Sequence, residues 1–115
     1  MVSVSQGEIW WAELPAPAGS AAGFRRQVII VQGNALNRSR LATVLCVPLT
    51  SNLTWASAPG NTPFSAKMAG LPKDSVANAT QLFAIDRAYL ATRIGKLAPK
   101  SLQQVLTSID VVLGR

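Results

Sequence analysis

The sequence predicts one small domain of mostly β (α+β) class, in which a run of strands is followed by a single helix. Short apolar stretches of strand length recur over residues 1–97, and loops rich in Pro, Gly, Ser and Asn separate them. After residue 98 the apolar residues change to helical spacing. Strands followed by a helix are typical of α+β domains or of a mostly β barrel. No internal repeat or composition boundary divides residues 1–115, so we expect a single domain.

The predicted strands follow one another along the chain. The first covers about residues 7–13, and a low-complexity loop of Pro, Gly, Ala and Ser follows at residues 15–23. The second covers about residues 25–32, where Val28–Val31 form an unbroken apolar run that is typical of a strand buried on both faces. Further strands are expected at residues 41–50, 63–67, 75–85 (as one bent strand or two) and 90–97.

The C-terminal segment predicts an amphipathic helix. Its apolar residues form one stripe with helical spacing, namely Leu102, Val105, Leu106, Ile109, Val112 and Leu113. Pro99 suits the first turn, because its missing N–H has no helical partner there. Gly114 suits the end of the helix, where the backbone often turns left-handed.

The charge balance is the first functional observation. Eleven Lys and Arg face five Asp and Glu, which gives a net charge of +6. Such an excess favours a polyanionic partner, either a nucleic acid or an acidic protein segment, over a role in solubility alone. Histidine is absent, which removes the usual general base and the commonest metal ligand. One Cys and five scattered acids offer no sensible metal site, so we expect an activity without metal or cofactor.

The single cysteine and the N-terminal residues indicate the cellular compartment to expect. Cys46 lies in the apolar stretch "LATVLCVPL", so we expect a core residue rather than a reactive thiol, and no disulfide within the chain. The N-terminus lacks the pattern of a signal peptide, and no apolar run approaches the ~20 residues that span a bilayer. We therefore expect a cytoplasmic protein without a membrane partner.

Two groups of polar residues stand at the ends of neighbouring predicted strands. Arg25 and Arg26 begin the second strand, and Thr50, Ser51 and Asn52 end the third. The connection between these strands is too short for a parallel crossover, so antiparallel pairing would put Arg26 beside Thr50. A guanidinium and a hydroxyl together suit one phosphate group. The alternative is a solvated basic pair and an ordinary turn rich in Ser, Thr and Asn.

Other polar and aromatic residues are candidates for contacts with bases. Asn37 lies in the polar connection after the second strand, and Asn78 and Gln81 interrupt the expected strand 75–85. These amides either read base edges or simply face solvent. We expect one residue of Trp10–Trp11 in the core and regard Trp55, in a polar loop, as the better candidate for base stacking.

Several short motifs occur in a characteristic order. They are "GEIWWA", a flexible Gly-containing loop, an Arg before β-branched residues, "PLTSN", and "GLPKDSVANATQLFAIDRAYL". In this order and spacing they resemble the MazF/PemK/Kid-type toxin endoribonucleases of bacterial type II toxin–antitoxin systems. The resemblance covers almost the whole chain, including the "IGKL" segment and the terminal helix.

The resemblance implies a fold, an activity and partners. The fold is a small SH3-like, CcdB-type β-barrel with short helices and a C-terminal helix, and the protein is a homodimer. The activity is sequence-specific, metal-independent cleavage of single-stranded RNA (mRNA), which inhibits translation and growth. The substrate's 2′-hydroxyl attacks the adjacent phosphate and leaves a cyclic phosphate. A cognate antitoxin with an acidic C-terminal segment neutralises the toxin.

The resemblance also assigns residues. The family's catalytic arginine falls on Arg26, and its catalytic Thr or Ser falls on Thr50. Gln27 replaces the usual Pro after the arginine, and Asn78 and Thr80 stand where some members have Arg and Asp, so no carboxylate base is available there. The residues expected to bind substrate are Arg25, Asn37, Ser51, Asn52, Asn78 and Gln81.

Two other functions remain open from the sequence. One is a toxin that acts by binding DNA gyrase on a related fold, although such toxins do not share the placement of Arg26 and Thr50. The other is an RNA-binding barrel that uses its basic face and Trp55 without chemistry. Only the endoribonuclease predicts strand scission.

Overall fold

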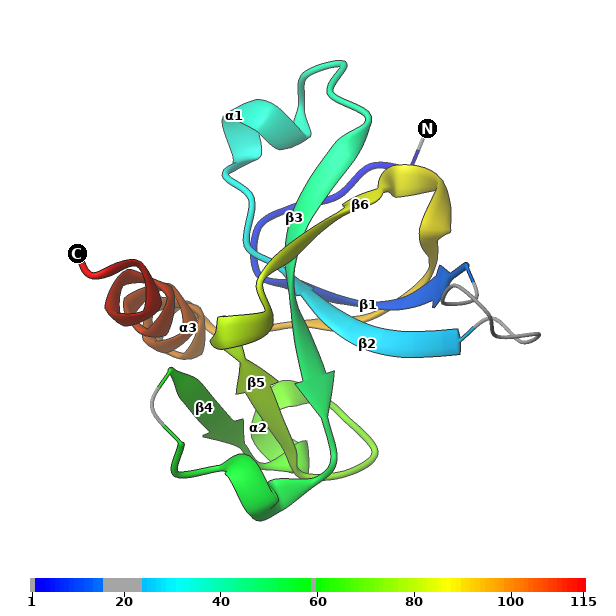
Figure 1. The fold of residues 1–115 in the computed structure, drawn as a ribbon. Helices are drawn as coiled ribbons and strands as arrows, with labels where there is room; N and C mark the ends of the chain where they lie inside the picture. The colour runs from blue at the N-terminus through cyan, green and yellow to red at the C-terminus, as the bar shows by residue number, and fades with distance from the viewer. Residues whose placement is uncertain (1, 16–23, 59) are drawn as a thin grey trace.

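The computed structural model describes residues 2–15, 24–58 and 60–115 (Figure 1). The expected loop of residues 15–23 therefore lies outside the described residues from position 16 on. The strands are β1 (Glu8–Leu14), β2 (Phe24–Ile30), β3 (Thr43–Thr50), β4 (Asn61–Phe64), β5 (Ser75–Asn78), β6 (Phe83–Asp86) and β7 (Leu90–Lys96). The helices are α1 (Asn34–Asn37), α2 (Ala66–Ala69) and α3 (Pro99–Leu113), and the 3₁₀ turns are η1 (Leu53–Trp55), η2 (Ala79–Gln81) and η3 (Arg87–Tyr89).

The strands form one antiparallel sheet in the order β4-β5-β3-β2-β1-β7. The first half of β3 pairs with β6, and its last two residues pair with β5. Pro48 lies between these two ladders, where a residue without an N–H is well placed. Among the described strands no pairing joins β7 back to β4 or β6. The expected mostly β class with a terminal helix is confirmed, but the expected barrel is corrected to an open sheet, since no pairing among the described strands closes it.

One expected strand differs from the structure in detail, and another forms two strands, one of the two possibilities that the sequence left open. The expected strand 63–67 is β4 followed at once by α2, and the expected strand 75–85 is two strands with η2 between them. The break allows β5 and β6 to pair with different parts of β3. The choice between one bent strand and two is therefore settled as two strands, which pair with β3 in different registers.

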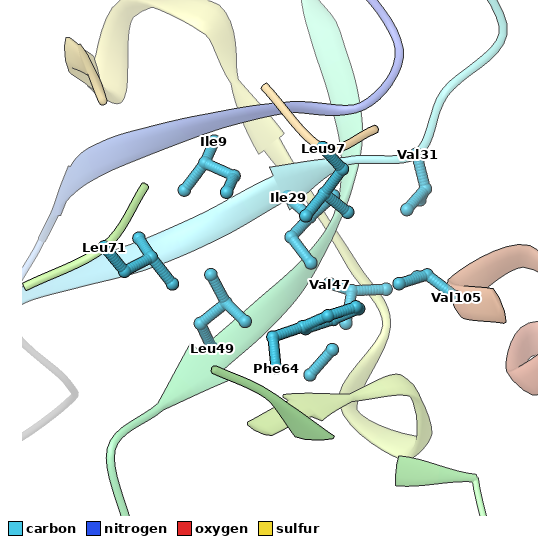
Figure 2. Close-up of a cluster of buried hydrophobic side chains, with 10 residues drawn as sticks. Ile9, Ile29, Val31, Val47, Leu49, Phe64, Leu71, Leu97 and Val105 are labelled. Carbon is cyan, nitrogen blue, oxygen red and sulfur yellow. The ribbon is translucent and has the colours of Figure 1, made fainter. Parts of the chain in front are cut away.

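The central strand β2 contributes to two hydrophobic clusters, as its unbroken apolar run predicts. Ile29 and Val31 belong to the first cluster, and Val28 and Ile30 to the second. Figure 2 shows the first cluster, in which side chains of β1, β2 and β3 meet Val105 of α3. Burying each such side chain completely contributes roughly 1.5–3 kcal/mol. Because β2 is packed on both faces, its buried residues also fix the position of the backbone at Arg25 and Arg26, near the start of the strand.

Helix α3 begins and ends where the sequence predicts. Pro99 lies in its first turn, and Gly114 follows it in a left-handed conformation with φ of 73°. Val105 is fully buried, whereas Val112 and Leu113 at the end of the stripe are exposed. No helix in the described part of the chain is long and apolar enough to cross a membrane.

The buried guanidinium of Arg87 holds four segments together. Arg87 is 3% exposed, and it donates to the carbonyls of Val2, Leu36, Asn37 and Leu41. The shortest of these bonds, to Asn37 O, is 2.7 Å. The N-terminal segment, α1 and the start of β3 therefore depend on one side chain.

We expect Arg87→Ala to lower the free energy of unfolding by roughly 3 kcal/mol or more, because it removes a buried side chain and leaves one buried and three partly buried carbonyls without this donor. Arg93→Ala is the matched control, since Arg93 is a half-exposed partner of Glu8. The control should cost less than about 1 kcal/mol. Urea denaturation measures both values, and equal losses would contradict the role of Arg87.

The prediction that Cys46 is a core residue is confirmed. The side chain is fully buried in the second cluster, and burial raises the pKa of the thiol from 9.0 to about 12. As the pH rises above about 9, the unfolded chain therefore loses this proton before the folded chain does.

The stability contribution of Cys46 should accordingly be complete below pH 9 and be lost between pH 9 and 12. Urea denaturation of the wild type and of Cys46→Ala across this range isolates the effect, because the variant lacks this group. A thiol reagent should label Cys46 quickly only after unfolding. Rapid labelling of the native protein would contradict the prediction.

Candidate functional site

Strands β2 and β3 bring Arg26 and Thr50 together, as the antiparallel pairing predicts. The ladder between them runs from Ile30 and Cys46 to Gln27 and Leu49. The next residues outward, Arg26 and Thr50, therefore face each other on the same side of the sheet. Opposite residues of this kind have Cβ atoms about 4.5–5.5 Å apart. Their positions are fixed by the buried strand residues behind them.

A basic groove surrounds this pair. Its volume is about 420 Å³. Its polar and charged lining comprises Arg25, Arg26, Gln27, Thr50, Ser51, Lys73 and Ser75. No carboxylate is among the described residues that line it. Three cations and several hydroxyls make it suitable for a phosphate group.

The two arginines have different surroundings. The guanidinium of Arg25 lies 4.5 Å from the ring centre of Trp11, and its Nε is 3.6 Å from a carboxylate oxygen of Glu13. Arg26 is half-buried and makes no hydrogen bond or ion pair with any described residue. Its N–H donors are therefore available to a ligand, whereas Arg25 is already partly neutralised.

The hydroxyl of Thr50 is oriented by the turn that follows β3. The backbone N–H of Asn52 donates to Thr50 Oγ1 at 3.1 Å, so the hydroxyl's own hydrogen is left to point elsewhere. The side chain of Asn52 accepts from Thr54 N and caps η1. Asn52 thus supports Thr50, while Ser51 between them lines the groove.

Lys73 and Trp11 complete the groove, and sequence reasoning did not assign them to it. Lys73 is exposed in the turn before β5, and its carbonyl accepts from the hydroxyl of Ser75 at 3.1 Å. The neighbouring Asp74 turns its carboxylate to the N–H of Ala66 at the start of α2. The "GLPKDS" segment was the available signal, but only the folded sheet shows that its lysine lines the same groove as Arg26.

Asn37, predicted to contact a substrate, is buried and does not line the groove of Arg26 and Thr50. Asn37 is 4% exposed, its side chain donates to Gln32 O at 2.8 Å, and it accepts from Gln32 Nε2. Gln32 also bonds the carbonyl of Thr43, so this amide pair lies at the start of β3. Thr43 and Thr50 are the two ends of β3, a strand of eight residues, and lie about 24 Å apart. The Asn37–Gln32 pair is therefore far from the groove at Thr50.

The remaining predicted residues lie outside this groove. The side chain of Asn78 accepts from the hydroxyl of Thr80 at 2.7 Å, at the end of β5 that is distant from Ser75. Gln81 borders a second groove that also contains Arg26. Trp10 is buried, which confirms that one residue of the tryptophan pair is in the core. The side chain of Trp55 lies outside the described part of the chain.

The sequence matches a family model over residues 5–113, and the model describes PemK-like, MazF-like toxins of type II toxin–antitoxin systems. The chain belongs to this family. The MazF-like toxin is 38% identical over 110 residues to endoribonuclease MazF6 of Mycobacterium tuberculosis (strain H37Rv), with 96% of each chain covered. It is 29% identical to the endoribonuclease toxin MazF of Escherichia coli K12, with 94% of this chain and 92% of the relative covered.

Solved structures support the same fold. A MazE–MazF structure from Deinococcus radiodurans has a TM-score of 0.81 at 20% identity and covers 99% of this chain and 98% of that chain. The toxin MazF-mt6 of Mycobacterium tuberculosis has a TM-score of 0.75 at 21% identity and covers 93% and 96%. The open sheet with its terminal helix is therefore the MazF fold.

Proposed function

We propose that this MazF-like toxin cleaves single-stranded RNA in the groove between Arg26 and Thr50, with sequence specificity and without a metal ion. Its relatives over the full chain are named endoribonucleases, which assigns RNA strand cleavage to this chain. The observation that carries the proposal is the half-buried Arg26, which has no ion-pair partner among the described residues and lies opposite Thr50 in a groove whose described lining contains no carboxylate.

The reaction that suits this groove uses a nucleophile from the substrate. The RNA 2′-hydroxyl gives up its proton to solvent and its oxygen forms a bond to the adjacent phosphorus. The bond from phosphorus to the 5′-oxygen breaks, the 5′-oxygen takes up a proton from solvent, and a cyclic phosphate remains. The protein must hold these three atoms in line and stabilise negative charge on the phosphate oxygens. Arg26 supplies two N–H donors and Thr50 a hydroxyl donor for those oxygens. No Ser–His pair is required.

Arg25, Ser51 and Lys73 suit the phosphates that flank the cleaved bond. They are exposed and line the same groove. Contacts of this kind position the strand, and their strength falls as salt increases. The residues that recognise bases are therefore to be sought elsewhere along the groove.

We expect Thr50→Val to lower the cleavage rate by less than removal of Arg26 does, because it removes one neutral donor while keeping the side-chain shape. Thr92→Val is the matched control, since Thr92 is exposed on β7. Single-turnover cleavage of a labelled RNA measures both. A Thr50→Val protein that is as fast as the control would remove Thr50 from the mechanism.

The direct test of the proposed function is incubation of the purified toxin with a long single-stranded RNA in excess EDTA. We expect discrete fragments with cyclic phosphate ends, whose sequences give the recognised motif. Arg26→Ala run in parallel should leave the RNA intact. Intact RNA from folded wild-type protein would favour a binding toxin instead, and a DNA gyrase assay would then follow.

A toxin of a type II system is paired with an antitoxin, and we propose that the antitoxin's acidic C-terminal segment covers the basic groove. The net charge of +6 and the three cations of the groove favour such a segment. A polyglutamate peptide should therefore compete with RNA and raise its apparent KM. Inhibition that is independent of RNA concentration would argue for another surface.

We also propose that the toxin is a homodimer, as the family resemblance implies. Exposed apolar side chains near α1 and at the end of α3 offer surface for association, including Leu36, Leu41, Leu45, Val111 and Leu113. Light scattering should give twice the chain mass of 12.2 kDa. A monomeric mass in an active sample would overturn this proposal.

A further inference from the structure

A second groove opens beside Arg26 and is not used by the mechanism above. Its volume is about 550 Å³, and its lining includes Leu14, Gln81, Phe83 and Tyr89 as well as Arg26. Its one described carboxylate, Asp86, accepts from the backbone N–H of Ala88 at 2.8 Å. Arg26 lines both grooves, so the phosphate-binding groove and this one are adjacent. In contrast to the first groove, the second has two aromatic side chains.

Strand pairing places the ring of Phe83 on the same face of the sheet as Arg26. Phe83 pairs with Cys46 of β3, and both contact the second hydrophobic cluster. Val28, two residues after Arg26 on β2, is part of that cluster too. Leu14 packs against it from β1. The ring of Phe83 is therefore partly buried and held in position at the edge of the core.

The other two side chains of the groove are available to a ligand. Tyr89 is 38% exposed. Gln81 is exposed as well, and neither side chain makes a hydrogen bond to a described residue. Exposed or half-buried aromatic rings are the usual platforms on which proteins stack single-stranded bases, and an adjacent amide can bond a base edge.

We propose that the groove of Phe83 and Tyr89 is a base-binding subsite of this endoribonuclease. The base of a nucleotide next to the phosphate held by Arg26 stacks on these aromatic side chains, and Gln81 bonds the edge of that base. A nucleotide suits the arrangement because it joins an anion and a flat π-system, as Arg26 and the rings require. The inference rests on the proposed function and deepens it, because it assigns residues to specificity.

The test uses the full chain and an RNA that contains the mapped cut sequence. A 2′-deoxy substitution at the cut site blocks cleavage, and 2-aminopurine replaces in turn each base that flanks the scissile phosphate. We expect wild-type protein to quench the fluorescence of 2-aminopurine at one of these positions. Phe83→Leu and Tyr89→Leu should lose this quenching, whereas Tyr89→Phe, which keeps the ring, should retain it.

Kinetics on the cleavable RNA provide the second measurement. We expect each leucine variant to raise KM roughly 5- to 100-fold with little change in kcat, since stacking binds the strand without acting on the phosphate. Gln104→Leu is the control, because Gln104 is exposed on α3 and lines neither of the two grooves at Arg26. It should change neither KM nor quenching.

The outcomes separate the two proposals. If the wild type cleaves RNA but shows no quenching at either position, or both leucine variants keep the wild-type KM, the subsite is overturned and the endoribonuclease stands. If the wild type cleaves no RNA, both fall. Tyr89 is an exposed position, so Tyr89→Leu keeps the test decisive even where Phe83→Leu unfolds the protein.

Discussion

Arg26→Ala should lower the rate of RNA cleavage by at least roughly 10²–10³-fold, the typical cost of removing one preorganised donor from a charged transition state. Arg26 makes no hydrogen bond or ion pair within the described residues, so its removal breaks no such internal bond. It is held at the end of a strand whose next residues are buried, and this fixes its direction before the substrate arrives. The thermal midpoint should therefore stay near that of the wild type.

Arg40→Ala is the matched control for this variant, because it removes the same charge from an exposed position before the start of β3. Arg25→Ala should have an intermediate effect, since Arg25 already interacts with Glu13 and Trp11. Single-turnover rates at saturating RNA separate a loss of chemistry from a loss of binding. An Arg26→Ala protein that cuts at nearly the wild-type rate would refute the assignment.

The pairing of Arg26 with Thr50 could be predicted from the sequence because it depends on local rules. A short connection forces two neighbouring strands to run antiparallel, and this alone decides which of their ends meet. The unbroken apolar run that follows Arg26 likewise predicts burial on both faces, which the two clusters confirm. Similar local rules place the ends of α3 at Pro99 and Gly114.

The burial of Asn37 could not be predicted in this way. In the sequence it belongs to a polar connection, and polar connections are usually exposed. In the structure its carbonyl accepts from Arg87, which is 50 residues away, and its side chain pairs with Gln32. Asn37 is therefore a structural residue because its carbonyl and its side chain form hydrogen bonds with Arg87 and Gln32 inside the protein.

The rest of the groove depends on long-range pairing as well. Lys73 reaches it because β5 pairs with the last two residues of β3, and Phe83 reaches the second groove because β6 pairs with the first half. The absence of a pairing between β7 and the opposite end of the described sheet, which leaves the sheet open where a barrel was expected, is long-range as well. The sequence left open whether residues 75–85 form one bent strand or two, and it contains no signal for this exchange of partners.

An RNA with a single 2′-deoxy nucleotide at the cut site should not be cleaved at all, and DNA of the same sequence should also stay intact. In the proposed mechanism the 2′-oxygen is the nucleophile, so its removal leaves nothing to attack the phosphorus. The phosphates and bases remain unchanged, and Arg26, Arg25 and Lys73 can still bind them. The substituted RNA should therefore inhibit cleavage of normal RNA competitively, with an inhibition constant close to the KM of the normal substrate.

This experiment distinguishes the nucleophile from the binding groups. Cleavage of the substituted RNA would mean that water attacks the phosphate, which requires a group that removes a proton from water. The described lining of the groove offers only guanidinium, ammonium, amide and hydroxyl side chains near the phosphate site, and none of these is a good general base at neutral pH. A substituted RNA that is neither cut nor bound would instead show that the protein needs the 2′-hydroxyl to bind RNA. Loss of cleavage would then not identify the nucleophile, and RNA binding by Arg26→Ala would have to be measured before its cleavage rate is interpreted.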